Sequence, residues 1–168
     1  MSINKKEFNL EQVVKLCVVV NISLFLFVAF MLILFVYFNI TPMIYYSVIA
    51  MIGYVLYFML LKRQKVCAYM WCVYATIIIY MAIATICLGY KCGFNLYSMS
   101  LIPIIFYSQY ISTKTDTKDT NPLAVSIAIV AVSIISSAIA IINGPLYEIN
   151  KTIISVMLGC NAISVSAF

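Results

Sequence analysis

The sequence predicts an all-α membrane protein, a polytopic helical bundle of about six transmembrane helices. Of its 168 residues, 65% are hydrophobic and 9% are charged, and the mean hydropathy is +1.11, far above that of soluble domains. Polar loops divide the apolar residues into runs close to the ~20 residues that cross a bilayer as one helix. These observations predict a single transmembrane domain over residues 1–168, with the lipid bilayer as its main partner.

Six apolar runs define the predicted spans, at residues 16–38, 43–61, 66–90, 94–111, 122–142 and 152–168. The first run is too long for a signal-peptide core and has no small-residue cleavage site after it, so we expect an anchor helix that stays in the protein. Within it, Asn21 and Ser23 are expected to face neighbouring helices. Pro42 and Pro122 suit the first turns of the second and fifth spans.

The last two runs differ from the others in composition and length. Residues 125–142 are rich in Ala and Ser and contain no aromatic residue, which predicts a helix deep in the bundle, because small side chains allow close approach. The sixth run would reach only about 25 Å at 1.5 Å per residue, short of a ~30 Å hydrocarbon core. Because the sequence stops at Phe168 inside this run, we expect a catalytic domain to follow.

The distribution of cations predicts the orientation. Alternate loops place eight of the ten lysine and arginine residues on one side, namely Lys5, Lys6, Lys15, Lys62, Arg63, Lys65, Lys114 and Lys118, and leave Lys91 and Lys151 on the other. By the positive-inside rule the N-terminus is cytoplasmic, and an intact sixth helix would end there too. The net charge of +5 is therefore explained by membrane topology, and no nucleic-acid partner is expected.

Residues that usually carry chemistry are scarce. The sequence contains no histidine, and none of its six cysteines has CxxC spacing. No ionisable side chain falls at the centre of a predicted span, which is where ion-coupled transporters usually keep one. Phosphate-binding, metalloprotease and nucleophile-elbow motifs are also missing. We therefore predict no catalytic residue, no metal site and no cofactor in this segment.

The most site-like stretch joins the third and fourth spans. A small-molecule ligand could bind there at the outer face, in a mouth of aromatic and polar residues: Tyr90, Lys91, Gly93, Phe94, Asn95, Tyr97 and Tyr107. The alternative is an ordinary interfacial aromatic belt with a lysine that reaches for headgroups. Pro103 is a candidate hinge or a static kink. Gln109 and Asn161 are expected to form hydrogen bonds between helices.

The order LGYKCGFNLYSMSLIPIIFY at residues 88–107, followed by a polar loop and the segment NGPLYEIN, resembles the N-terminal membrane regions of bacterial GGDEF-type diguanylate cyclases. The resemblance rests on Gly89, Gly93, Phe94, Tyr97, Pro103 and Phe106. It implies a sensor domain in the bacterial plasma membrane, ahead of a cytoplasmic domain that makes cyclic di-GMP from GTP in a homodimer. No GGDEF motif is present, so no catalytic position carries over.

Three functions follow as hypotheses. The first is a sensory input domain for a signalling enzyme, and the resemblance favours a diguanylate cyclase, although similar inputs precede histidine kinases and adenylate cyclases. The second is a transporter or permease fragment, which predicts uptake or efflux in vesicles. The third is a passive anchor or scaffold for a partner enzyme, which predicts that an unrelated anchor would preserve regulation.

Overall fold

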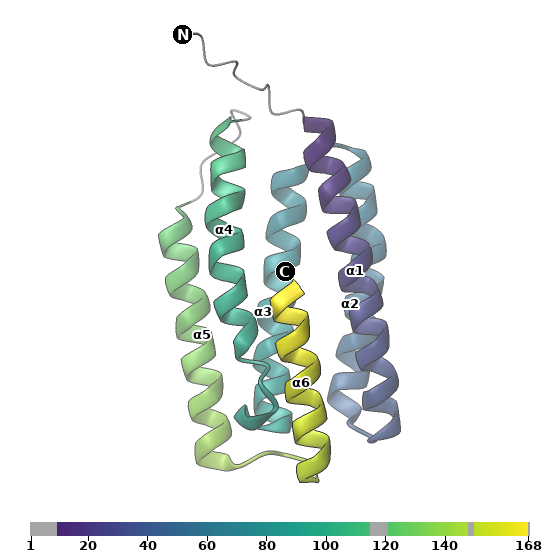
Figure 1. The fold of residues 1–168 in the computed structure, drawn as a ribbon, viewed down its shortest axis with the longest axis vertical. Coiled ribbons are helices and arrows are strands. Elements are labelled where there is room, and N and C mark those ends of the chain that lie inside the picture. Colours follow the sequence, from purple (N-terminus) through teal and green to yellow (C-terminus); the bar gives the residue numbers. More distant parts are fainter. Residues whose placement is uncertain (1–9, 115–120, 148–149, 168) are drawn as a thin grey trace.

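The computed structural model describes residues 10–114, 121–147 and 150–167, which form an all-helical bundle (Figure 1). Within these residues, six α-helices and one short 3-10 turn follow one another: α1 (Leu10–Tyr37), α2 (Thr41–Lys62), α3 (Val66–Leu88), η1 (Tyr90–Cys92), α4 (Leu96–Lys114), α5 (Pro122–Asn143) and α6 (Lys151–Ala167). The predicted all-α class is confirmed. The largest difference in bounds is at α1, which begins at Leu10 and not at residue 16.

Four of these helices are long and apolar enough to cross a membrane: Glu11–Tyr37, Thr41–Lys62, Val66–Leu88 and Pro122–Asn143. The apolar parts of α4 and α6 are shorter, at Leu96–Tyr107 and Ile153–Ile163. The four long helices indicate a membrane-embedded bundle. A crossing by α4 and by α6 stays a prediction.

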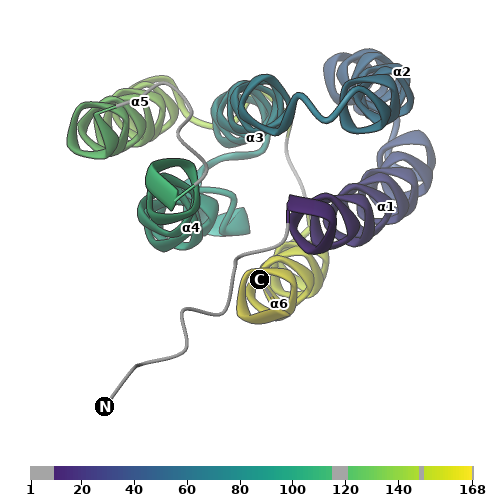
Figure 2. The ribbon, with the colours of Figure 1, turned by 90° about the horizontal axis from the view of Figure 1, so that it is seen from above.

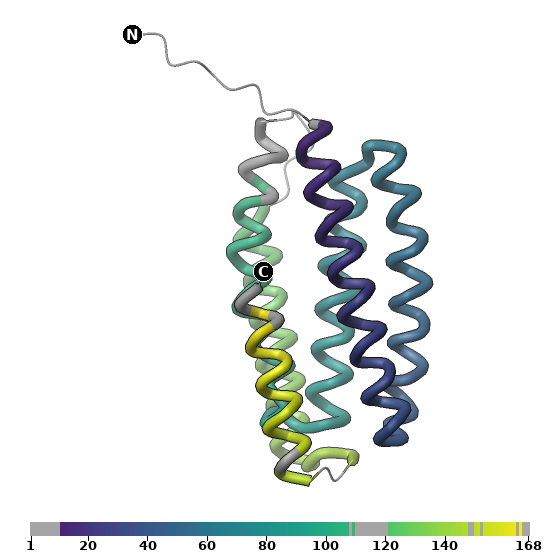
Figure 3. The backbone as a smooth tube through the Cα atoms, turned by 45° about the vertical axis from the view of Figure 1, so that its right-hand side comes forward, coloured from purple at the N-terminus to yellow at the C-terminus, as the bar shows by residue number. Residues whose placement is uncertain are grey.

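The helices form two rows when the bundle is viewed along its axis (Figure 2). One row holds α5, α3 and α2, and the other holds α4, α6 and α1. The end of the bundle that carries η1 and the link from α5 to α6 is called the η1 end, and the opposite end, with the loop at residues 62–65, the Lys62 end. From the η1 end, α6 rises between α4 and α1 and stops partway along them (Figures 1 and 3).

The prediction that the fifth helix lies deep in the bundle is wrong. α5 stands at one edge, where it packs against α3 and α4 (Figure 2). Its small residues Ser126, Ser136 and Ala140 are buried on that side, while large residues such as Ile134 and Ile142 are exposed. Small side chains on one stripe permit close approach to two neighbours, and the other face keeps isoleucine for lipid contact. The most buried of the four long helices is α3.

Several polar side chains connect helices in the interior. Asn21 of α1 is fully buried, and its Nδ2 donates to the carbonyl oxygen of Tyr54 in α2 at 3.0 Å, as predicted. The prediction for Ser23 is wrong, because this residue is exposed and its Oγ donates to Val19 within the same helix. Tyr69 of α3 donates its hydroxyl to the carbonyl oxygen of Cys17 in α1 at 3.1 Å. Bonds of this kind fix neighbouring helices in register.

The helix starts follow the predicted proline chemistry. Pro42 lies in the first turn of α2, and Pro122 opens α5. The side chain of Asn121 caps α5 by accepting hydrogen bonds from the backbone amides of Leu123 and Ala124, at 3.1 and 3.4 Å. These caps satisfy amide groups that the first helical turn leaves without an intrahelical partner.

The hydrophobic core divides into three clusters of buried residues. The cluster at the η1 end joins α1, α2, α3, η1, α4 and α6 around Phe35, Met81 and Phe94. Toward the Lys62 end, one cluster joins α1, α2 and α3, and a separate one joins α3, α4 and α5. The last two clusters lie on either side of α3. In the part of the chain that the structure describes, α1 and α4 do not pack closely against each other along this length.

Candidate functional site

Six of the seven residues of the predicted outer mouth lie together at η1, but not as an open mouth. The side chains of Tyr90 and Lys91 are exposed, and Asn95 is half-buried. Phe94 is completely buried and packs against the ring of Tyr80, with a centroid distance of 6.2 Å. The stretch therefore has a polar outer surface and an aromatic inner side that belongs to the core.

The remaining mouth residue, Tyr107, lies elsewhere. It is ten residues beyond Tyr97 on α4, which corresponds to about 15 Å along the helix. Its side chain is half-exposed toward the Lys62 end. Pro103, the candidate hinge, lies inside α4 between these two tyrosines and is exposed. Its ring removes the amide that would donate to the carbonyl group of Met99, one turn earlier.

Gly93 is required at the end of η1 for two reasons. Its φ of +80° is in the left-handed region, which side chains with a Cβ rarely adopt. A Cβ at this position would also lie 2.5 Å from Cδ1 of Leu158, so α6 passes directly over the turn. Both the conformation of the turn and the position of α6 therefore depend on Gly93.

A single buried amide ties α6 to the turn and to α4. Asn161 is fully buried, and its Nδ2 donates to the carbonyl oxygen of Cys92 at 2.8 Å. Its Oδ1 accepts a hydrogen bond from the hydroxyl of Tyr97 at 3.2 Å. We call these three residues the Asn161 clamp. The sequence indicated that Asn161 bonds between helices, but not which helices it joins.

The Asn161 clamp affects stability because its amide group is buried in apolar surroundings. An amide in apolar surroundings costs free energy unless both its ends are paired. Interhelical hydrogen bonds in membrane proteins contribute about 0.6 kcal/mol on average, and up to about 1.7 kcal/mol. The two hydrogen bonds of the clamp thus contribute on the order of 1–3 kcal/mol to the position of α6.

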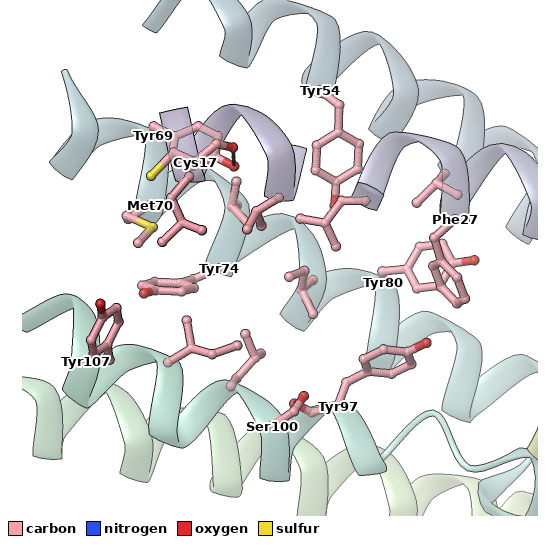
Figure 4. Close-up of a pocket in the computed structure, with 18 of the residues that line it drawn as sticks. Cys17, Phe27, Tyr54, Tyr69, Met70, Tyr74, Tyr80, Tyr97, Ser100 and Tyr107 are labelled. Carbon is pink, nitrogen blue, oxygen red and sulfur yellow. Dashed lines mark hydrogen bonds between the residues drawn. The ribbon is translucent and has the colours of Figure 1, made fainter. Parts of the chain in front are cut away.

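A cavity of about 360 Å³ lies on the Lys62 side of the clamp. The residues that line it come from four helices: Val13, Leu16, Cys17, Val20, Leu24, Phe27 and Val28 of α1; Tyr54 of α2; Tyr69, Met70, Val73, Tyr74, Ile77 and Tyr80 of α3; and Tyr97, Ser100, Leu101, Ile104 and Tyr107 of α4. Figure 4 shows most of these side chains around the cavity, with α1 and α4 as its two walls and α3 behind.

Aromatic side chains close the cavity toward the η1 end. The rings of Phe27 on α1 and Tyr97 on α4 meet there, with centroids 6.1 Å apart (Figure 4). Tyr69 and Tyr107 lie near the other end. Tyr97 therefore has two roles, because its ring lines the cavity while its hydroxyl bonds to Asn161. This residue connects the cavity to α6.

The lining is suited to binding and not to acid–base chemistry. In the described part of the chain, none of the lining residues is an Asp, Glu, Lys or Arg. Its polar groups are chiefly tyrosine hydroxyls, and that of Tyr69 already donates to a backbone carbonyl. An apolar cavity with a few hydroxyls fits an uncharged or amphipathic molecule. Sequence reasoning missed the cavity because its residues are spread over four helices and have no local pattern.

Substitution of Gly93 tests the close packing of α6 against the turn. Gly93→Ala is expected to destabilise the folded protein by about 1–2 kcal/mol, because alanine is strained at a positive φ and meets Leu158. The matched control is Gly159→Ala in α6, where a Cβ meets nothing within 4 Å. That change should leave stability unchanged or raise it by up to about 1 kcal/mol. Thermal unfolding in detergent micelles measures both, and equal effects would contradict this account.

The thiol of Cys92 gives a pH-dependent test. It is fully buried and donates weakly to the carbonyl oxygen of Leu88, and burial raises its pKa to about 11. A thiol with a raised pKa stays protonated at neutral pH, so alkylation should be slow at pH 8 and should quicken about tenfold per pH unit up to pH 11. The measurement is iodoacetamide labelling of a variant that keeps Cys92 as its sole cysteine. Fast labelling below pH 8 would mean that α6 leaves the turn uncovered.

Comparison of this chain with family models, with curated proteins and with solved structures gives no match. The clamp, the cavity and the membrane-embedded bundle are therefore the features of this chain that bear on its function.

Proposed function

We propose that this chain is the membrane-embedded sensory module of a bacterial signalling protein, with α6 as its output element. The observation that carries the proposal is the Asn161 clamp, because it joins α6 to both η1 and α4 by hydrogen bonds. A diguanylate cyclase domain after Phe168, active as a homodimer, is the output that the sequence resemblance favours. A stimulus that moves the turn or α4 would then reach that domain through α6.

The contacts of α6 support this role. Among the described elements, α6 packs chiefly on η1 and α4, and Met157 is its fully buried anchor in the core. A shift of α6 would therefore act first on η1 and α4. A switch of this kind needs two states that differ by only a few kcal/mol. The clamp has a free energy of that order.

The direction of the signal follows from the predicted topology. The η1 end would face outward, with Tyr90 and Lys91 exposed to the outside, and the Lys62 end would face the cytoplasm. Because α6 runs from the η1 end toward the Lys62 end, it would lead from the sensing surface to a cytoplasmic domain.

Removal of one hydroxyl tests the clamp. A diguanylate cyclase domain is fused after Phe168, and its activity is measured in cells as the concentration of cyclic di-GMP. We call this concentration the output, and measure it while the external pH, salt and nutrients are varied. Tyr97→Phe keeps the ring and removes the hydrogen bond to Asn161, which contributes on the order of 1 kcal/mol. The output in a given condition, and with it the range across conditions, should change by up to about fivefold, since 1 kcal/mol changes a two-state equilibrium constant by that factor.

The matched control is Tyr107→Phe, the same change on the same helix but away from α6. It should leave the range of output unchanged. An unchanged range in the Tyr97→Phe fusion would remove the clamp from the signalling model. If replacing the bundle with an unrelated membrane anchor preserved regulation, the scaffold hypothesis would replace the sensory proposal. Solute uptake into vesicles that contain the chain would favour the transporter hypothesis.

Topology has its own test. Gln64 and Lys91 are exposed at opposite ends of the bundle, so each can be replaced by cysteine in a cysteine-free background. A membrane-impermeant maleimide should label Lys91→Cys in intact cells and should label Gln64→Cys only after permeabilisation. Labelling of Gln64→Cys from outside would reverse the orientation and remove the case for an inward signal.

A further inference from the structure

We infer that the loop between α2 and α3 binds the headgroup of an anionic phospholipid, such as phosphatidylglycerol, from the leaflet at the Lys62 end. We call this segment, which consists of Lys62, Arg63, Gln64 and Lys65, the basic loop. The inference goes beyond the proposed function, because the loop can bind a lipid whether or not α6 reports to an output domain. It also holds for either orientation of the chain in the membrane, since both leaflets contain headgroups.

The three cations of the basic loop have no acidic partner in the described part of the chain. Every residue of the loop is exposed. Glu11 is the one acidic residue within the described ranges, and it forms a salt bridge with Lys15 on α1 at 2.7 Å, so that these two charges cancel each other. Three positive charges within four residues therefore remain for an anionic partner.

Backbone hydrogen bonds hold the basic loop in one compact shape. The amides of the three residues after Lys62 donate to carbonyl oxygens in the last turn of α2, at 3.2, 2.9 and 3.0 Å: Arg63 to Met59, Gln64 to Leu61 and Lys65 to Leu60. Gln64 has a φ of +55°, which lets the chain reverse its direction here. Because these carbonyl groups already accept hydrogen bonds, the cations are not needed to cap α2, and their side chains are available to a ligand.

An exposed apolar surface continues from the basic loop. Met59 lies one turn before Lys62 on the same face of α2 and is 61% exposed, and Trp71 of α3 is 43% exposed. Since α2 and α3 are both long and apolar enough to cross a membrane, these side chains lie where acyl chains surround the bundle. Cations next to an apolar surface match the two parts of a phospholipid, its charged headgroup and its acyl chains. A soluble acidic protein or a nucleic acid would use the charges alone.

The charge of the basic loop selects the kind of headgroup. Each lysine or arginine near a bilayer surface favours an anionic lipid by roughly fivefold in its binding constant. The positive N-terminal end of α3, which begins at Val66 directly after the loop, acts in the same direction. Phosphatidylglycerol has a single negative charge, whereas phosphatidylcholine also has a choline cation that the loop repels. Since water and salt screen exposed charges, we take the value for one cation, about fivefold, as the minimum preference of the whole loop.

The sole tryptophan of the chain reports on this site. Trp71 lies six residues after Lys65, about 9 Å along α3, within the length of a lipid that binds at the loop. The full chain is reconstituted in bilayers of equal amounts of phosphatidylglycerol and phosphatidylcholine, with bromine atoms on the acyl chains of one lipid or the other. Bromine quenches tryptophan fluorescence on contact. The binding constant of phosphatidylglycerol, relative to that of phosphatidylcholine, should be about five or more.

Matched removals of charge locate the site. The variant with Lys62→Gln, Arg63→Gln and Lys65→Gln should lower this ratio of binding constants to about one. The control variant with Lys91→Gln and Lys151→Gln removes cations that are exposed at the η1 end, and it should leave the ratio unchanged. If the triple variant does not fold, as judged by circular dichroism, the variant with Arg63→Gln and Lys65→Gln gives a second reading and should lower the ratio at least about twofold.

Salt gives an independent reading on the unaltered chain. In about 1 M sodium chloride the Debye length falls to about 3 Å, so an ionic preference should fall to a ratio near one. A ratio near one at low salt would overturn the proposal and leave the cations with a role in topology alone. A ratio that high salt or the loop variants leave unchanged, or that the η1-end control lowers as much as they do, would also overturn it.

The outcomes separate this proposal from the signalling model. A preference for phosphatidylglycerol that depends on the basic loop, together with an unchanged range of output in the Tyr97→Phe fusion, would keep the lipid site and remove the signalling role. A changed range of output together with equal binding of the two lipids would do the reverse.

Discussion

The structure depends on how the space between α1 and α4 is filled. Near the η1 end, α6 occupies that space and carries Met157 into the core, and α1, α3, α4 and α6 form one continuous cluster there. Toward the Lys62 end, the core divides into two clusters on either side of α3. Tyr97 lies at the boundary between the clamp and the cavity, because its hydroxyl bonds to Asn161 and its ring lines the cavity.

Several buried polar groups in this bundle hold neighbouring helices in register. Lipid offers no hydrogen bonds, so a buried amide or hydroxyl is favourable only where a partner is fixed opposite to it. Asn21 and Tyr69 fasten α1 to α2 and α3, and Asn161 fastens α6 to the turn and to α4. Elsewhere the helices are held by close packing, as along the small-residue side of α5.

Local chemistry explains which features could be predicted from the sequence. Long apolar runs, Pro42, Pro122 and Gly93 act within a few residues of their own positions, so the helices and turns were predicted nearly at their observed limits. The place of α5 was predicted wrongly because composition does not show that its small residues lie on one side only. The predicted mouth brought together residues that are close in the chain, yet Phe94 turns inward to the core and Tyr107 lies at the far end of α4.

The sequence by itself determined that this is a helical membrane protein and, to within a few residues for most helices, where its helices begin and end. It could do so because hydrophobicity, helix length and backbone chemistry are properties of each segment alone. Only the tertiary structure decided that Asn161 meets Tyr97 and Cys92, and that nineteen residues from four helices enclose one cavity. The physical reason is that apolar helices can pack in many arrangements of similar energy, and their partners are chosen by side-chain contacts between distant segments.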